Sequence, residues 1–71
     1  MLDINIYKKV KDRRILLGIT QQDLSDISGV ALRTIKQIET GKGNPSINTL
    51  TKIAEVLGMS IELIIKNPDN I

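Results

Sequence analysis

The stretch from Thr20 to Gly41 reads TQQDLSDISGVALRTIKQIETG and predicts two short helices joined by a tight turn. Thr20 suits the N-cap of the first helix, because its hydroxyl can accept a first-turn N–H while Asp23 reaches back from three positions later. Gly29 suits a left-handed helix end, and Gly41 is expected to stop the second helix in the same way. The pattern therefore predicts a helix-turn-helix over residues 20–41.

The two predicted helices divide their side chains between a core and an outer surface. Helical spacing turns Leu24 and Ile27 inward from the first helix, and Ile35 and Ile38 inward from the second. Ser25 is small enough to let the two helices cross closely. The outward set of the second helix comprises Leu32, Arg33, Lys36 and Gln37.

This outward set has side chains that suit DNA bases. Arginine pairs with guanine and glutamine with adenine through two hydrogen bonds, and leucine can touch a thymine methyl group. The second helix of such a motif enters the major groove, so we expect base contacts from all four residues, with Lys36 reaching either a base or a phosphate. The alternative is an ordinary solvated helix face, on which one exposed leucine needs no explanation.

Many further residues occur at the spacing of a known family. They are Arg14, Gly18, Thr20-Gln21, Leu24, Gly29-Val30, Ile35, Ile38-Glu39, Gly41-Lys42, Asn44-Pro45-Ser46, Leu50, Ile53-Ala54 and Leu57-Gly58. From about Tyr7 to about Leu63 the chain resembles the Cro/phage-repressor (Xre-type) helix-turn-helix regulators. The resemblance implies a mostly α, lambda-repressor-like bundle of four to five helices.

Two positions depart from the family pattern. The family usually has a serine or threonine cap at position 31 and most commonly alanine at position 25, whereas this chain has Ala31 and Ser25.

The resemblance also implies roles for individual residues. Arg14 would form a partly buried ion pair with Glu39, and this pair would tie the first helix to the second helix of the motif. Gln21 would contact a DNA phosphate from the start of its helix, where backbone N–H groups also favour anions. Such backbone contacts position a protein on DNA but do not read its sequence. Further backbone contacts are implied for Thr40, Lys42 and Asn44.

Two more helices flank the motif. The apolar stripe of Ile6, Val10 and Leu17 predicts a helix over residues 6–17, ended by Gly18. A fourth helix should start at a Ser46 cap, end at Gly58 and bury Ile47, Leu50, Ile53, Ala54 and Leu57. The first helix also carries basic residues, which either form a solvated face or contact phosphates: Lys8, Lys9, Lys11 and Arg13.

Residues 60–66 allow two interpretations. Ile61, Leu63 and Ile65 alternate with Glu62, Ile64 and Lys66, which is the period of a strand. The alternative is a short fifth helix that uses Ile61, Ile64 and Ile65. A strand here would have no partner within the chain, so we expect it to pair with the same segment of a second subunit. The segment is therefore predicted to mediate homodimerisation.

The amino-acid composition limits the kinds of protein that this chain can be. The 71 residues allow one domain, with a net charge of +2 and a single aromatic residue, Tyr7. Cysteine and histidine are absent, so we expect no disulfide, metal site or cofactor, and a cytoplasmic location. We interpret Asp23 and Asp26 as a solvated pair of carboxylates and not as a catalytic dyad. Residues 41–43 do not form a phosphate-binding loop, because no strand precedes them and the Walker spacing is missing. We therefore expect neither an enzyme nor a membrane protein.

The sequence therefore predicts a transcriptional regulator, most simply a repressor. It should bind a palindromic double-stranded DNA operator as a homodimer through the helix over residues 31–40, because one such helix reads too few base pairs for useful specificity. Two alternatives stay open. One is an antitoxin that binds a toxin protein and regulates its own operon, and the other is a controller of a restriction–modification operon.

Overall fold

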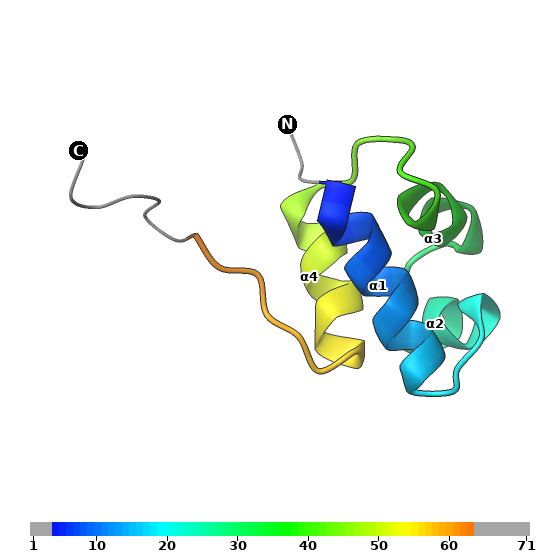
Figure 1. Cartoon of the computed structure of the whole chain (residues 1–71). Helices are drawn as coiled ribbons and strands as arrows, with labels where there is room; N and C mark the ends of the chain where they lie inside the picture. Colours follow the sequence, from blue (N-terminus) through cyan, green and yellow to red (C-terminus); the bar gives the residue numbers. More distant parts are fainter. Residues whose placement is uncertain (1–3, 64–71) are drawn as a thin grey trace, which may run out of the picture.

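The computed structural model describes residues 4–63, which form four helices and no strand (Figure 1). Helix α2 packs against α3 and α4, and α1 packs against α3. The prediction of a mostly α helix-turn-helix bundle is confirmed, with α1 shifted toward the N-terminus of its predicted span. The elements are α1 (Ile4–Leu16), α2 (Gln21–Ser28), α3 (Leu32–Glu39) and α4 (Ile47–Val56).

One apolar core lies between the helices. Five of its side chains have less than 2% of their surface exposed: Leu24, Ile35, Ile38, Ile53 and Leu57. Three core predictions, for Ile27, Leu17 and Ile47, were wrong. Ile27 is 64% exposed, because α2 ends one residue later and the chain turns at Gly29; the buried apolar residue of this turn is Val30. Leu17 is 45% exposed, because α1 ends at Leu16 and its inward stripe ends with it. Ile47 is 63% exposed, because it is the first residue of α4 and lies on the open groove between α1 and α4.

The end of α3 shows why a glycine is required there. Gly41 has φ +75°, and its amide donates to the Ile38 carbonyl at 3.0 Å while the Lys42 amide donates to the Gln37 carbonyl at 2.8 Å. This is the Schellman arrangement, which satisfies the last carbonyls of a helix. A Cβ at Gly41 would also lie 3.4 Å from Cδ2 of Tyr7. The close approach of Tyr7 therefore sets α1 against the end of α3.

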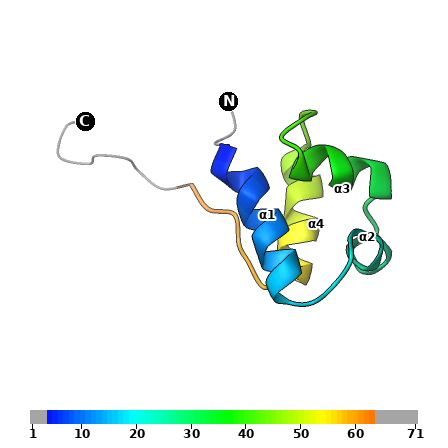
Figure 2. The same cartoon turned by 45° about the vertical axis from the view of Figure 1, so that its right-hand side comes forward.

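The segment that follows α4 differs from both sequence interpretations. Ser60–Leu63 is neither strand nor helix. It first lines the groove between α1 and α4 and then leaves the bundle (Figures 1 and 2). A strand needs a neighbour for its N–H and C=O groups, and residues 4–63 contain no other strand that could supply one. Leu63 is fully exposed and Ile61 is 44% exposed. Ile65 lies outside the described residues.

The start of α2 supports a prediction about pH. Thr20 and Asp23 form a reciprocal capping box, with the Asp23 amide 2.9 Å from the Thr20 hydroxyl and the Thr20 amide 2.9 Å from the Asp23 carboxylate. Hydrogen bonds from the Thr20 backbone and hydroxyl lower the pKa of Asp23. The stabilisation is therefore complete above the unfolded-state pKa, about 3.9, and is lost as pH falls through the lower folded-state pKa.

We expect Asp23→Asn to lower the free energy of unfolding at neutral pH, and this difference from the parent chain should vanish in acid. Urea titrations of both proteins across the acid range measure it. An identical difference at neutral and at acidic pH would contradict the role of the carboxylate.

Candidate nucleic-acid interface

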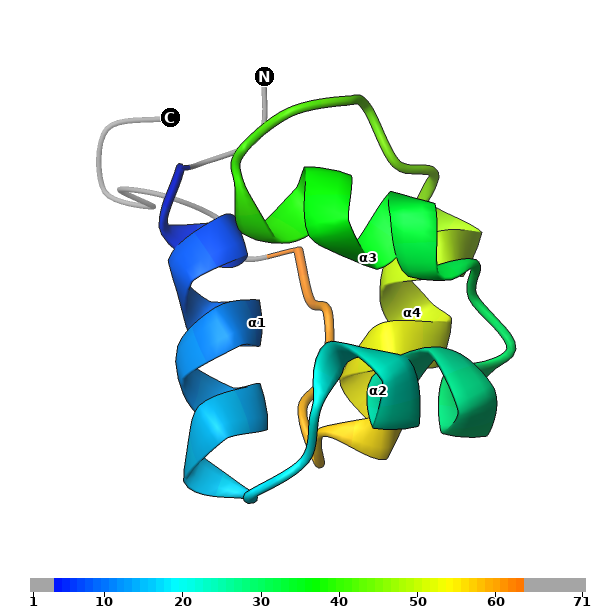
Figure 3. The same cartoon turned by 90° about the vertical axis from the view of Figure 1, so that its right-hand side faces the viewer.

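Helix α3 lies at the surface of the bundle (Figure 3). Its inward side chains, Ile35 and Ile38, are at most 1% exposed. Opposite them, the predicted outward side chains gather around one shallow surface hollow. The hollow is lined by four exposed residues, Arg33, Lys36, Gln37 and Thr40, and by the half-buried Leu32. The structure thus brings together all the residues for which base contacts were expected.

A buried charge network holds α3 against α1. Arg14 Nε donates to Glu39 Oε2 at 2.7 Å and Arg14 Nη2 donates to Glu39 Oε1 at 2.9 Å. The side chains of the pair are only 12% and 2% exposed. The pKa of Arg14 is raised by the hydrogen bond to Glu39, so the guanidinium stays charged. Arg14 also donates to the Ile19 carbonyl at 3.0 Å, which fixes the linker between α1 and α2.

Gln21 joins the same network. Its side-chain amide donates to Glu39 Oε1 at 3.2 Å, and the residue is half-buried. One N–H of the amide is therefore committed to holding α2 against α3. The carbonyl oxygen and the second N–H remain for other contacts, so the phosphate contact expected of Gln21 stays a prediction. The sequence contained no signal for the bond to Glu39, because the two residues lie 18 positions apart.

Two serines organise the turn between α2 and α3. The Ser25 hydroxyl donates to the Val30 carbonyl at 2.7 Å, and the Val30 amide donates to the Ser28 hydroxyl at 3.1 Å. Ser25 therefore does more than allow a close helix crossing, since alanine at this position could not make the bond. Ala31, the other departure from the family pattern, leaves the start of α3 without a side-chain cap.

The loop after α3 carries the remaining predicted backbone contacts. Lys42 and Asn44 are exposed, and together with Gln37 they line a notch between α3 and this loop. A Cβ at Gly43 would lie only 3.5 Å from Oε1 of Gln37, so the loop backbone passes close to that side chain. The loop ends at Ser46, whose hydroxyl accepts the Thr49 amide at 3.1 Å and caps α4.

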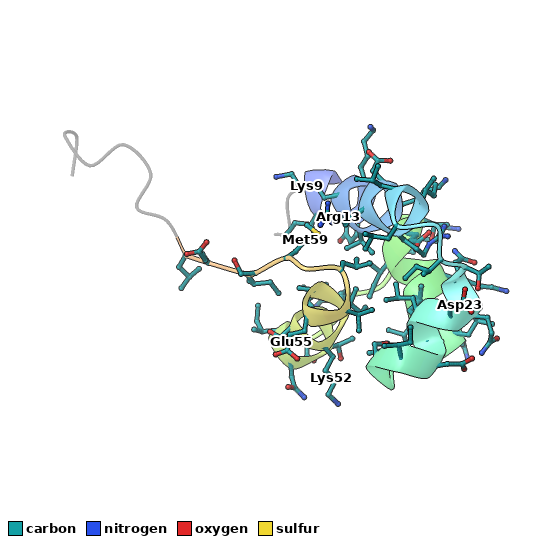
Figure 4. All side chains as sticks on the ribbon, turned by 90° about the horizontal axis from the view of Figure 1, so that it is seen from below. Lys9, Arg13, Asp23, Lys52, Glu55 and Met59 are labelled. Carbon is teal, nitrogen blue, oxygen red and sulfur yellow. The ribbon has the colours of Figure 1, made fainter. Side chains whose placement is uncertain are left out.

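The basic residues of α1 do not form one face. Arg13 is half-buried and its Nε donates to the Leu57 carbonyl at 2.8 Å, so this residue caps the end of α4. Placing Arg13 on an outer charged face was wrong, because the open carbonyl at the end of α4 draws it inward. Lys9 lies on the same side of the bundle, near Arg13 and Met59 (Figure 4). Lys8 pairs with Asp12 at 3.0 Å.

Within residues 4–63, no group of three or more His, Cys, Asp or Glu side chains is placed to hold a metal ion. In the same range, none of the helices has the length and apolar character needed to cross a membrane.

Comparison with known proteins identifies the fold family. The helix-turn-helix family matches residues 10–64. The chain belongs to the Cro/phage-repressor (Xre-type) helix-turn-helix family. An uncharacterized helix-turn-helix-type transcriptional regulator of Methanocaldococcus jannaschii is 44% identical over 54 residues, covering 76% of this chain and 82% of that protein. The resemblance drawn from the sequence is thereby confirmed.

Two bacterial relatives of the helix-turn-helix family carry phage names. The SPbeta prophage-derived uncharacterized transcriptional regulator YonR of Bacillus subtilis is 32% identical over 59 residues, which are 83% of this chain and 55% of that protein. The cryptic phage CTXphi transcriptional repressor RstR of Vibrio cholerae is also 32% identical over 59 residues, 83% of this chain and 53% of that protein. The chain thus spans little more than half the length of these two relatives.

Proposed function

We propose that this protein is a transcriptional regulator that binds double-stranded DNA with α3 in the major groove, and that it acts as a repressor. The observation that carries the proposal is the outer face of α3, where Arg33, Lys36 and Gln37 are exposed side by side. These side chains have the hydrogen-bonding groups that distinguish base pairs in that groove. The phage-derived regulator and the phage repressor among its relatives support the repressor role.

The rigidity of α3 further supports this proposal. Two fully buried isoleucines and the Glu39 network hold the helix from behind, so its outer side chains project from a fixed support. A side chain must be placed precisely to form two hydrogen bonds with one base. Phosphate contacts from Gln21, Lys42 and Asn44 would set the position of α3 along the groove.

We also propose a homodimer, whose contact includes an apolar groove between α1 and α4. The groove has a volume of about 340 Å³. Ile47 on its rim is 63% exposed and Ile61 is 44% exposed, which is unfavourable for a monomer. Leu63 follows Ile61 and is fully exposed. The lining includes Ile6, Val10, Ile47, Leu50, Ala54 and Ile61.

Ile47→Ser should weaken dimerisation at least tenfold, because burying an isoleucine contributes about 1.5–3 kcal/mol. Sedimentation measurements over a concentration series give the dissociation constant. Ile27→Ser is the matched control, since Ile27 is 64% exposed but lies on α2. A parent chain that stays monomeric at micromolar concentration, or an equal effect of both variants, would refute this dimer contact.

Enrichment of bound duplexes from a random DNA pool tests the function itself. A dimeric reader should select an inverted repeat whose half-site centres lie about 34–36 Å apart, one turn of DNA. Failure to enrich any sequence would refute sequence-specific binding. Enrichment of a single half-site would leave DNA reading intact but refute the dimeric mode.

Lys42→Ala should weaken binding to every duplex and reduce the slope of log K against log salt by about one. The exposed position of Lys42, directly after α3, supports a phosphate contact. Fluorescence anisotropy at several salt concentrations measures the slope. An unchanged slope would remove Lys42 from the interface.

The antitoxin and restriction-controller alternatives receive no comparable support. The strand-like tail that suggested an antitoxin is absent from Ser60–Leu63. We therefore propose the regulator alone.

A further inference from the structure

A second surface hollow lies between α1 and the end of α3. Tyr7, Lys8 and Lys11 line it from α1, and Thr40 and Gly41 line it from the end of α3. Thr40 also lines the hollow on the outer face of α3. The two hollows therefore meet at Thr40, and the proposed base-reading surface continues onto α1. Figure 3 shows the end of α3 beside the first half of α1.

Of the charged side chains around this second hollow, one lysine has no ion-pair partner among the described residues. Lys8 pairs with Asp12 at 3.0 Å, so their charges compensate each other. The Glu39 carboxylate is 2% exposed and is neutralised by Arg14. Lys11 is exposed and forms no ion pair with any described residue. The net charge available to a ligand here is therefore positive and resides on Lys11.

The hydrogen-bond donors at the end of α3 also point to Lys11, because they are already used within the protein. The Thr40 hydroxyl donates to the carbonyls of Lys36 and Gln37 at 3.0 Å, so its hydrogen is used within the helix. The Gly41 amide is likewise used, by the Ile38 carbonyl. Among the described residues that line this hollow, Lys11 is thus the cationic donor that has no ion-pair partner.

We propose that Lys11 binds a DNA backbone phosphate beside the major groove occupied by α3. This inference rests on the proposed function, because it needs α3 in the groove. The phosphates of both strands border that groove, so a cation beyond the end of α3 faces one of them. The contact extends the DNA interface from the helix-turn-helix onto α1 and separates Lys11 from the other basic residues of that helix.

Lys9 is the matched control for this proposal. It belongs to the same helix, carries the same charge and is also exposed. It lies on the other side of α1, where it lines the hollow with Arg13 and Met59 (Figure 4). Lys9 also lines the groove of the proposed dimer contact, so the comparison uses the salt slope and not the affinity itself. Removal of either lysine changes the net charge by the same amount, so a difference between the two variants reports position.

The test measures binding of a labelled mixed-sequence duplex by the parent chain, Lys11→Ala, Lys11→Arg and Lys9→Ala at several salt concentrations. Lys11→Ala should reduce the slope of log K against log salt by about 0.9. The ratio of the parent's binding constant to that of Lys11→Ala should therefore fall about 3.5-fold between about 50 and 200 mM salt. Lys11→Arg should restore the slope and Lys9→Ala should leave it unchanged. Thermal midpoints of all variants should match the parent, since both lysines are exposed.

An unchanged slope for Lys11→Ala, or equal changes for Lys9→Ala and Lys11→Ala, would overturn the Lys11 contact. Lys42→Ala in the same assay separates this failure from failure of the proposed function. If Lys42→Ala lowers the slope and Lys11→Ala does not, only the extension onto α1 is wrong. If the parent chain itself shows no salt-dependent binding, both proposals are wrong.

Discussion

Glu39→Ala is expected to lower the free energy of unfolding by about 3–5 kcal/mol, the largest effect anticipated for this protein. The substitution leaves the Arg14 guanidinium charged and unpaired in a position where only 12% of its side chain is exposed. It also removes the partner of the Gln21 amide. One change thus releases contacts among α1, α2 and α3, and urea titration at neutral pH measures the loss.

Two companion variants show whether the loss arises from the uncompensated charge. Glu39→Gln keeps the volume and one acceptor, so it should lose less stability than Glu39→Ala. Combining Arg14→Met with Glu39→Leu removes both charges, and buried pairs replaced by apolar residues are often tolerated. The double variant should therefore be more stable than Glu39→Ala. An unfolding midpoint for Glu39→Ala within error of the parent would rule out a stabilising role for the pair.

Arg33→Ala is expected to weaken binding to the selected DNA by about 1–3 kcal/mol and to flatten base preference at one position per half-site. Arg33 is exposed on the outer face of α3, where its guanidinium can donate two hydrogen bonds to guanine. Binding to a mixed-sequence duplex should change much less, because base recognition adds little to non-specific affinity.

The comparison between the two duplexes distinguishes a base contact from a phosphate contact. Equal losses on selected and mixed-sequence DNA would show that Arg33 contacts only the backbone. Lys52→Ala removes the same charge from the exposed surface of α4 and controls for net charge (Figure 4). Its effect on both duplexes should be small.

Features that depend on neighbouring residues were predictable from the sequence. The Thr20 cap needs only Asp23 three positions away, and the ends at Gly41 and Gly58 need only a residue that tolerates positive φ. The inward and outward faces of α3 follow from helical spacing, because eight residues between two sharp ends leave one orientation that buries both isoleucines. The candidate base-reading set could therefore be read directly.

Periodicity was less informative where a helix face lies at the boundary of the core. Ile27 has the right spacing to accompany Leu24, but it lies at the end of the short α2 and is exposed, whereas Val30 from the turn is buried. Arg13 looks like an ordinary surface charge until α4 places the Leu57 carbonyl next to it. Residue spacing along one helix contains no information about which helix packs opposite.

The sequence by itself determined the helix-turn-helix, its end signals and the side chains on the outer face of α3, because these depend on contacts within a few residues. Only the tertiary structure decided which partners the charged side chains contact. It paired Glu39 with Gln21 as well as Arg14, assigned Arg13 to the end of α4, and placed Lys11 beside the end of α3. Those assignments depend on groups that are far apart along the chain and meet only when the helices pack.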